Sequence, residues 1–482
     1  MSKSIKKNYI YNTAYQILSL ITPLITTPYV SRVLGAKGIG EFSFSSSIVS
    51  YFAMFAALGT AIYGQREISY LQTNREKRTQ VFWEVVCMRL CSTIICLVLY
   101  IGFLAFTGFS MIYLIQIFTL LSVITDISWL LQGMEEFGKT VFRNVVFKIL
   151  NIAFILIAVQ KEEDLLLYIF GICFLQFLST VSLWAYLPRF VNRPTLRTLR
   201  PFSHFKLIFT LFLPTIAIQI YTVLDKTMIG VFAVSAVENG YYEQALKLSK
   251  MVLTIVTSLG TVMIPRIGHY FSLGDYDKVR SYMYRGYSFV WFLGIPLCFG
   301  VVGTASNIVP WFYGAGFEKV IPLLSILAFL ILAIGISNVT GMQYMIPTQR
   351  QNLFTLTVCI GAGINFFLNL LLIPRFYSIG AAIASVTAET AITLIQFYIV
   401  RKEFSIGKVL KLSKNYWIAG VGMLVLLLWE GNRLPATILH TIFMIFTGAI
   451  FYYIVLLILR DEFFISNMKH ILEPIGKRLP RK

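Results

Sequence analysis

The sequence has few charged residues. They make up 13% of the 482 residues, whereas hydrophobic residues make up 57%, and the mean hydropathy is +0.74. Soluble domains carry about 25% charged residues. The composition therefore excludes a soluble globular protein and predicts an integral membrane protein.

Enzyme motifs are also absent. The sequence contains no H-E-x-x-H metal motif, no Walker loop and no dinucleotide-binding fingerprint. Its four histidines are not spaced as a metal cluster, and no loop is long enough to fold as a catalytic domain. We predict a protein that is not an enzyme and holds no cofactor, so that transport by it runs downhill or on an ion gradient.

Cysteine is scarce, and all six cysteines fall inside apolar stretches. A free thiol there packs as a small hydrophobic side chain. We therefore expect no disulfides, and cysteine usage indicates no redox compartment.

Long apolar runs are what the sequence does contain. Runs of about 20 residues can each cross a hydrocarbon core about 30 Å thick as a helix, and these do not alternate as barrel strands do. The prediction is an all-α membrane protein with about 14 transmembrane helices. The predicted spans are Tyr9–Leu34, Phe42–Tyr63, Phe82–Phe106, Met111–Leu131, Thr140–Val159, Leu165–Leu187, Leu207–Val234, Tyr241–Ile264, Tyr287–Ser306, Val320–Ile346, Leu353–Ile373, Ile379–Val400, Tyr416–Trp429 and Ala436–Leu459.

The net charge of +19 is confined mostly to alternate loops, and the intervening loops hold only five lysines and arginines. Positive loops stay on the cytoplasmic side, so both termini are predicted to be cytoplasmic. The basic loops suit anionic lipid headgroups better than nucleic acid. We therefore expect membrane lipids as partners.

Several motifs recur about 200 residues apart. Leu58-Gly59-Thr60 reappears as Leu259-Gly260-Thr261, and each half opens near a glycine, Gly40 or Gly240, that is followed by an aromatic residue. Paired halves with a site between them are a recurrent transporter plan. We predict a six-helix lobe at 1–187, a cytoplasmic linker at 188–206, a second six-helix lobe at 207–400, and two extra helices with a tail at 401–482.

Polar and charged side chains line one face of spans 7 and 8. Three lysines in this region predict an anionic guest, although Glu243 could instead neutralise Lys247 one helical turn away. Arg32, near the outer end of span 1, could meet a phosphate or extend to the interface. The predicted substrate-binding residues are Arg32, Gln219, Thr222, Lys226, Lys247 and Lys250.

Asp225 lies beside Lys226 but about 100° round the helix from it. Together with Asn365 and Asn369 in span 11 and Thr387 in span 12, its carboxylate would suit Na⁺, or Asp225 could carry a proton. The alternative is an ion pair of Asp225 with Lys226 or Lys247. Glu389 in span 12 is a second candidate for proton transfer.

The first half has its own charged residues within spans. Arg89, Asp126 and Lys148 lie at similar depths in spans 3, 4 and 5. Similar depth favours a buried ion-pair cluster over a ligand site.

The stretch Pro28–Phe42, followed by Leu58-Gly59 and by Tyr63–Ile68, resembles the opening of polysaccharide flippases of the Wzx type. Trp129 to Gln132-Gly133, and Asn369 through Pro374 to Ala384, are similar to later landmarks of that family. The resemblance covers essentially the whole chain. It implies membership of the multidrug/oligosaccharidyl-lipid/polysaccharide exporter superfamily, with two six-helix lobes in a V around a cationic cavity.

The resemblance also implies a function. Such proteins move an undecaprenyl-pyrophosphate-linked oligosaccharide to the outer leaflet of the bacterial cytoplasmic membrane by alternating access. Related lipid II flippases place a Na⁺ site where this chain has Asp225, Asn365, Asn369 and Thr387, although Asn369 stands where an acid occurs there. We expect a monomer that works beside a glycan polymerase and export machinery; the alternatives are a cation-coupled multidrug exporter and a glycan polymerase or ligase.

Overall fold

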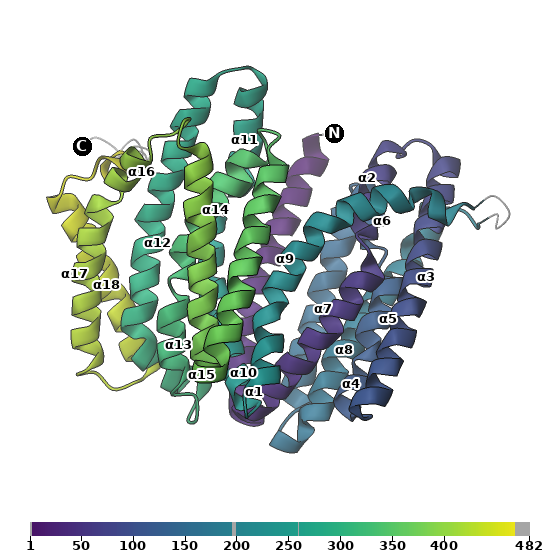
Figure 1. Cartoon of the computed structure of the whole chain (residues 1–482), viewed down its shortest axis with the longest axis horizontal. Helices are drawn as coiled ribbons and strands as arrows, with labels where there is room; N and C mark the ends of the chain where they lie inside the picture. Colours follow the sequence, from purple (N-terminus) through teal and green to yellow (C-terminus); the bar gives the residue numbers. More distant parts are fainter. Residues whose placement is uncertain (1, 195–198, 259, 468–482) are drawn as a thin grey trace, which may run out of the picture. The chain divides into compact units, whose positions relative to one another are not determined.

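A computed structural model of the protein describes residues 2–194, 199–258 and 260–467. Over these ranges the secondary structure is helical, with no strand (Figure 1). The chain forms two compact units, residues 1–240 and 241–482. The first unit includes the predicted linker and α9 because α9 packs against α1 and α2. The predicted division into two six-helix lobes joined by a linker stays a prediction.

The first unit contains the helices of the predicted spans 1 to 7. Its elements are α1 (Ser2–Ala57), α2 (Thr60–Tyr70), α3 (Arg75–Thr107), α4 (Met111–Ile115), α5 (Ile117–Thr125), α6 (Ser128–Gly133), α7 (Phe137–Ala158), η1 (Glu162–Asp164), α8 (Leu165–Ser182), η2 (Leu183–Arg189), η4 (Pro201–His204), α9 (Phe205–Phe232) and the first residues of α10 (Val237–Thr257). Within this unit α1 packs against α3, α5, α7 and α9.

The second unit holds the rest of α10 and the C-terminal helices. They are α11 (Gly260–Ser272), α12 (Tyr276–Tyr313), α13 (Val320–Leu327), α14 (Leu330–Asn338), η5 (Val339–Met345), α15 (Gln351–Val400), α16 (Ile406–Leu412), α17 (Lys414–Gly431) and α18 (Ile438–Ile458). Within this unit α12 contacts α13 and α14, and it also contacts α17 and α18 (Figure 1). It is therefore the helix around which the second unit is packed.

Ten helices among the described residues are long and apolar enough to cross a membrane. The all-α membrane fold is therefore confirmed. Two of the ten, Leu18–Tyr70 and Gln351–Val400, each contain a break and each cover two predicted spans. The helices α9 and α10, over predicted spans 7 and 8, are not among the ten, so the count of 14 crossings stays a prediction.

Both long helices break where one predicted span gives way to the next. In α1 the break is at Gly35, whose φ of 63° is open to glycine at little cost. In α15 it is at Tyr377, with φ 51°. A non-glycine residue seldom adopts that conformation. The sequence pattern thus locates both reversals of direction within a few residues.

The two glycines that open the predicted halves meet each other inside the first unit. A Cβ atom on Gly40 would lie 1.8 Å from the carbonyl oxygen of Ala236, and one on Gly240 would lie 2.0 Å from the carbonyl oxygen of Ala36. Contacts this short leave room for a hydrogen atom only. The arrangement is reciprocal, since each glycine approaches the residue four positions before the other glycine.

Other local features recur in the two halves with similar spacing. In the first half, α1 ends at Ala57 and α2 begins at Thr60. In the second half, α10 ends at Thr257 and α11 begins at Gly260. Each following long helix begins at a capping side chain: Asn74 accepts from the Lys77 N–H, and Asp275 accepts from the Lys278 N–H. The two halves thus share helix ends and N-caps as well as the sequence motifs.

The segment after η2 is held firmly against the start of α3. Arg78 donates through Nε and Nη2 to the Phe190 carbonyl, at 2.9 and 2.8 Å, and through Nη1 to the carbonyls of Leu71 and Gln72. The Arg78 side chain is buried, so these bonds replace its hydration. The beginning of the predicted linker is therefore part of the packed first unit.

A second polar network ties the end of the linker to α2 and α3. The Glu84 carboxylate is buried and accepts bonds from the Gln80 side chain and the Arg200 N–H, at 3.0 and 2.9 Å. Its other oxygen lies 2.7 Å from His204 Nε2, and His204 Nδ1 lies 2.7 Å from the Tyr63 hydroxyl. The start of α9 is thus fixed by one carboxylate.

Replacing Glu84 with Ala is expected to lower the free energy of unfolding by about 2 kcal/mol, because three partners lose a charged acceptor. Thermal unfolding of the purified protein in detergent, followed by size-exclusion chromatography, measures the change. Glu76→Ala is the matched control, since Glu76 is an exposed acid in the first turn of the same helix. Equal melting curves for the two variants would show that the network adds no stability.

Candidate functional site

A polar pocket of about 200 Å³ lies among the apolar helices of the first unit. It is formed by α1, α7 and α8, which pack against one another. Polar side chains inside membrane spans are costly unless they face protein or water, and they mark candidate pathways. The pocket is lined by Thr22, Asn144, Phe147, Lys148, Asn151, Ile172, Leu175, Gln176 and Ser179.

Helical spacing brings these residues to one place. Asn144, Lys148 and Asn151 are four and three residues apart, so they share one face of α7. Gln176 and Ser179 stand three apart on α8 and face the same cavity. The side-chain amides of Asn144 and Asn151 on α7 and of Gln176 on α8 can each donate and accept hydrogen bonds. This lining suits a hydroxyl-rich or phosphate-bearing guest.

Lys148 is the positive group of the pocket. It is partly buried, and its Nζ donates to Ser19 Oγ of α1 at 2.7 Å. Arg143, five residues earlier on α7, donates to the Ser179 carbonyl at 3.4 Å. The described lining residues other than Lys148 are uncharged, so an anion that enters the pocket would meet one ammonium group among amides and hydroxyls.

The predicted ion-pair cluster of Arg89, Asp126 and Lys148 stays a prediction, and the structure shows main-chain partners for the first two residues. Arg89 is buried and donates to the Thr60 hydroxyl at 2.8 Å and to the main-chain carbonyl of Asp126 at 2.5 Å. The Asp126 carboxylate instead accepts from the Ser128 N–H at 3.0 Å. Arg89 thus satisfies carbonyls freed at the break between α5 and α6, while Lys148 belongs to the pocket.

The predicted substrate-binding residues are spread over both units. In the first unit Arg32, Gln219 and Thr222 are exposed, and Lys226 is half-buried. In the second unit Lys247 is half-buried and Lys250 is exposed on α10. Each lysine and Arg32 makes at least one further interaction. A common anion site for these residues stays a prediction.

Asp225 is buried in the first unit, with 7% of its surface exposed. Two residues later, the Thr227 hydroxyl lies 3.0 Å from Ser47 Oγ and 3.1 Å from the Tyr51 hydroxyl, which are both on α1. Asp225 also acts electrostatically on Tyr51. The polar contact between α9 and α1 is thus made by Thr227.

The other predicted ion-coupling residues lie on α15. Asn365 and Asn369 are fully buried, and the Asn369 amide donates to Asn365 Oδ1 at 3.1 Å. Thr387 is exposed, and its hydroxyl donates to the Ile383 carbonyl at 2.7 Å. Glu389 is partly buried. Coupling to Na⁺ or H⁺ through these residues stays a prediction.

Asn144, Asn151, Gln176 and Ser179 were not among the residues predicted from the sequence. The signal was present, because polar residues at helical spacing interrupt spans 5 and 6. The prediction used charged residues, and only Lys148 among the polar residues of the pocket is ionisable.

Curated proteins are similar to this chain in sequence. The alignment with a provisional O-antigen transporter of Escherichia coli K12 is 23% identical and covers 83% of this chain and 97% of that protein. A provisional flippase of Haloferax volcanii, AglR, is 27% identical over 50% of this chain and 51% of its own length. These relatives are named for transport, in line with the predicted absence of enzymatic activity.

Solved structures share the fold. The lipid II flippase MurJ in its inward closed conformation superposes with a TM-score of 0.73 at 18% identity, over 94% of this chain and 99% of MurJ. An inward-facing multidrug transporter of the MOP superfamily gives 0.61 at 13% identity, over 83% and 96%. The family model described as polysaccharide biosynthesis protein matches residues 5–271, more than half of the chain. The chain is therefore a multi-pass membrane protein that belongs to the polysaccharide biosynthesis protein family.

Proposed function

We propose that this protein is a flippase for a lipid-linked oligosaccharide. It would take an undecaprenyl-pyrophosphate-linked repeat unit from the cytoplasmic leaflet of a bacterial cytoplasmic membrane and release it on the outer leaflet by alternating access. The observation that carries the proposal is the polar pocket around Lys148 within apolar helices, in a chain of this family. The relatives named as transporters and flippases support the same function.

The chemistry of the pocket fits such a cargo. Sugars offer many hydroxyl groups, and amides and hydroxyls bind them in both donor and acceptor roles. At about 200 Å³ the pocket is smaller than typical ligand sites of roughly 300–1,000 Å³, so it suits one polar group of a longer cargo. Lys148 would meet a phosphate oxygen or an acidic sugar, with a charge-assisted hydrogen bond.

The remaining predicted residues complete the proposal. Lys226, Lys247 and Lys250, with Arg32, would attract the pyrophosphate along its path. Asp225 would couple transport to an ion gradient, since the sequence has no nucleotide-binding motif. Cytoplasmic termini follow from the distribution of positive loops.

Deleting the gene in its host tests the function directly. We expect surface polysaccharide to disappear and lipid-linked repeat units to accumulate, and a copy of this chain on a plasmid should restore both. The leaflet that holds the lipid-linked repeat units is determined by treating intact spheroplasts with a membrane-impermeant glycosidase. Protected repeat units in the deletion strain indicate a block before translocation.

Two outcomes would overturn the proposal. Single repeat units accessible from outside would place the block at polymerisation. Normal surface polysaccharide together with increased sensitivity to cationic drugs would instead indicate drug export, the activity named for structures that share this fold.

A further inference from the structure

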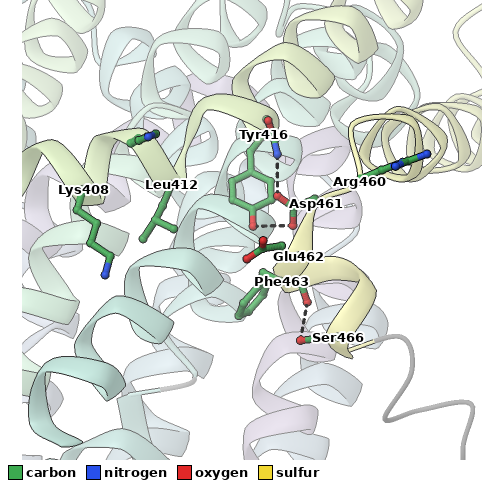
Figure 2. Close-up of a pocket in the computed structure, with 10 residues that line it drawn as sticks. Lys408, Leu412, Tyr416, Arg460, Asp461, Glu462, Phe463 and Ser466 are labelled. Atoms are coloured by element: carbon green, nitrogen blue, oxygen red, sulfur yellow. Dashed lines mark hydrogen bonds between the residues drawn. The ribbon is translucent and has the colours of Figure 1, made fainter. Parts of the chain in front are cut away.

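A second pocket, of about 830 Å³, lies in the C-terminal part of the second unit. It is bounded by α16, by the start of α17 and by the segment that follows α18 (Figure 2). Its lining combines three cations, two carboxylates and uncharged side chains: Lys408, Lys411, Leu412, Asn415, Tyr416, Arg460, Asp461, Glu462, Phe463 and Ser466. The pocket shares no lining residue with the pocket around Lys148, and none of the predicted substrate-binding residues lines it.

Asp461 fixes the shape of this pocket. One oxygen accepts from the Tyr416 hydroxyl at 3.1 Å and from the Phe464 N–H at 3.0 Å, and the other accepts from the Asn415 amide at 3.1 Å. Figure 2 shows Tyr416 and Asp461 facing each other at its centre. Since Asp461 is buried and already accepts three neutral donors, it is a structural group of the pocket wall.

The turn between α18 and Asp461 also positions the side chain of Arg460. Arg460 lies in the turn after α18 and has φ 51°, a left-handed conformation that arginine seldom adopts. The next N–H, of Asp461, bonds back to the Leu456 carbonyl at 3.1 Å, and the Asp461 carboxylate anchors the turn to α17. The exposed Arg460 side chain is therefore placed by a fixed backbone.

The three cations are not neutralised within the pocket. Over the described ranges, the side chains of Lys411 and Arg460 make no ion pair or hydrogen bond with protein groups, and Lys408 contacts only the face of the Tyr284 ring, 4.5 Å away. All three are exposed. They can therefore bind an anionic group that enters the pocket.

The neighbouring helix surfaces are strongly apolar. Val421 of α17 is 48% exposed, and Ile454 and Ile458 of α18 are 49% and 73% exposed. In a protein that spans a membrane such side chains face lipid chains. The pocket thus stands beside the start of α17 and the end of α18, the two helices that carry these apolar surfaces.

We propose that this pocket binds the phosphate headgroup of an anionic phospholipid through Lys408, Lys411 and Arg460. The adjacent apolar faces favour a lipid over free phosphate, and the three cations favour an anionic headgroup over a zwitterionic one. The site is independent of the glycan cargo. It gives the C-terminal helices a binding role of their own at the membrane surface.

The test measures binding of phosphatidylglycerol to the purified full-length protein in detergent by native mass spectrometry. The variant Lys408→Gln/Lys411→Gln/Arg460→Gln is expected to bind roughly 100-fold more weakly, at about 1 kcal/mol for each cation near a lipid surface. The matched control Lys77→Gln/Lys206→Gln/Lys402→Gln removes the same charge from exposed positions outside the pocket. It should change the affinity less than roughly threefold.

The variant Glu462→Gln is expected to change the affinity in the opposite direction. It removes an exposed negative charge from the pocket lining and should tighten binding, so the proposal stays testable even if the triple variant misfolds. Equal losses in the pocket and control variants, or no gain with Glu462→Gln, would overturn the site. Equal binding of phosphatidylcholine would overturn the charge recognition, and displacement by millimolar inorganic phosphate would overturn the lipid assignment.

Discussion

Replacing Lys148 with Met is expected to remove most surface polysaccharide while leaving the protein in the membrane at its normal level. The Nζ atom of Lys148 is the cationic donor of the pocket between α1, α7 and α8. A charged hydrogen bond to the cargo contributes about 1.5–3 kcal/mol, so its loss should slow export roughly 10- to 100-fold. Immunoblots of surface polysaccharide and of the membrane fraction measure the two quantities.

Two further variants separate a role in transport from a role in packing. Lys148→Arg keeps the charge and should retain much of the export, whereas Lys161→Met removes an exposed lysine in another part of the same unit and should change nothing. If Lys148→Met lowered the amount of membrane protein as strongly as export, the bond to Ser19 would be structural. Full export by that variant would exclude Lys148 from the path.

The second large effect concerns the glycine pair. Gly40→Ala should lower the free energy of unfolding by at least about 2 kcal/mol, because the new methyl carbon would lie 1.8 Å from the Ala236 carbonyl oxygen and the backbone must move. Gly102→Ala is the control, since nothing lies within 4 Å of a Cβ at that helical position. It should be neutral or slightly stabilising. Thermal unfolding in detergent measures both.

A double variant makes this test sharper. Once Gly40→Ala has separated the two backbone segments, Gly240→Ala should cost less than it does alone, because both methyl groups need the same separation. Strictly additive losses would mean that the two contacts are independent. Unchanged stability in both single variants would mean that the close approach does not exist in the folded protein.

The membrane fold was predictable because apolar length and loop charge are properties of short sequence windows. The reversals at Gly35 and Tyr377 follow from the same signal, since each separates two apolar runs. The division of the chain into compact units was not predictable in this way. It depends on how α9 packs along α1, which hydropathy does not encode.

The site was less predictable for a similar reason. Charge made Arg89, Asp126 and Lys148 conspicuous, but equal depth in three spans does not specify which helix faces meet. Arg89 turns to carbonyls at a helix break, a need that arises only once α5 and α6 form separate helices. The pocket depends on neutral Asn144, Asn151 and Gln176, whose spacing indicates a polar face but not its partner.

The mutual contact of Gly40 and Gly240 also limits how the two halves of the gene can diverge. Neither codon can change to one for a larger residue unless the opposite chain segment withdraws, so the positions are constrained as a pair although they lie 200 residues apart. Relatives in which the same two chain segments meet should keep glycine at both positions, even where the surrounding sequence differs.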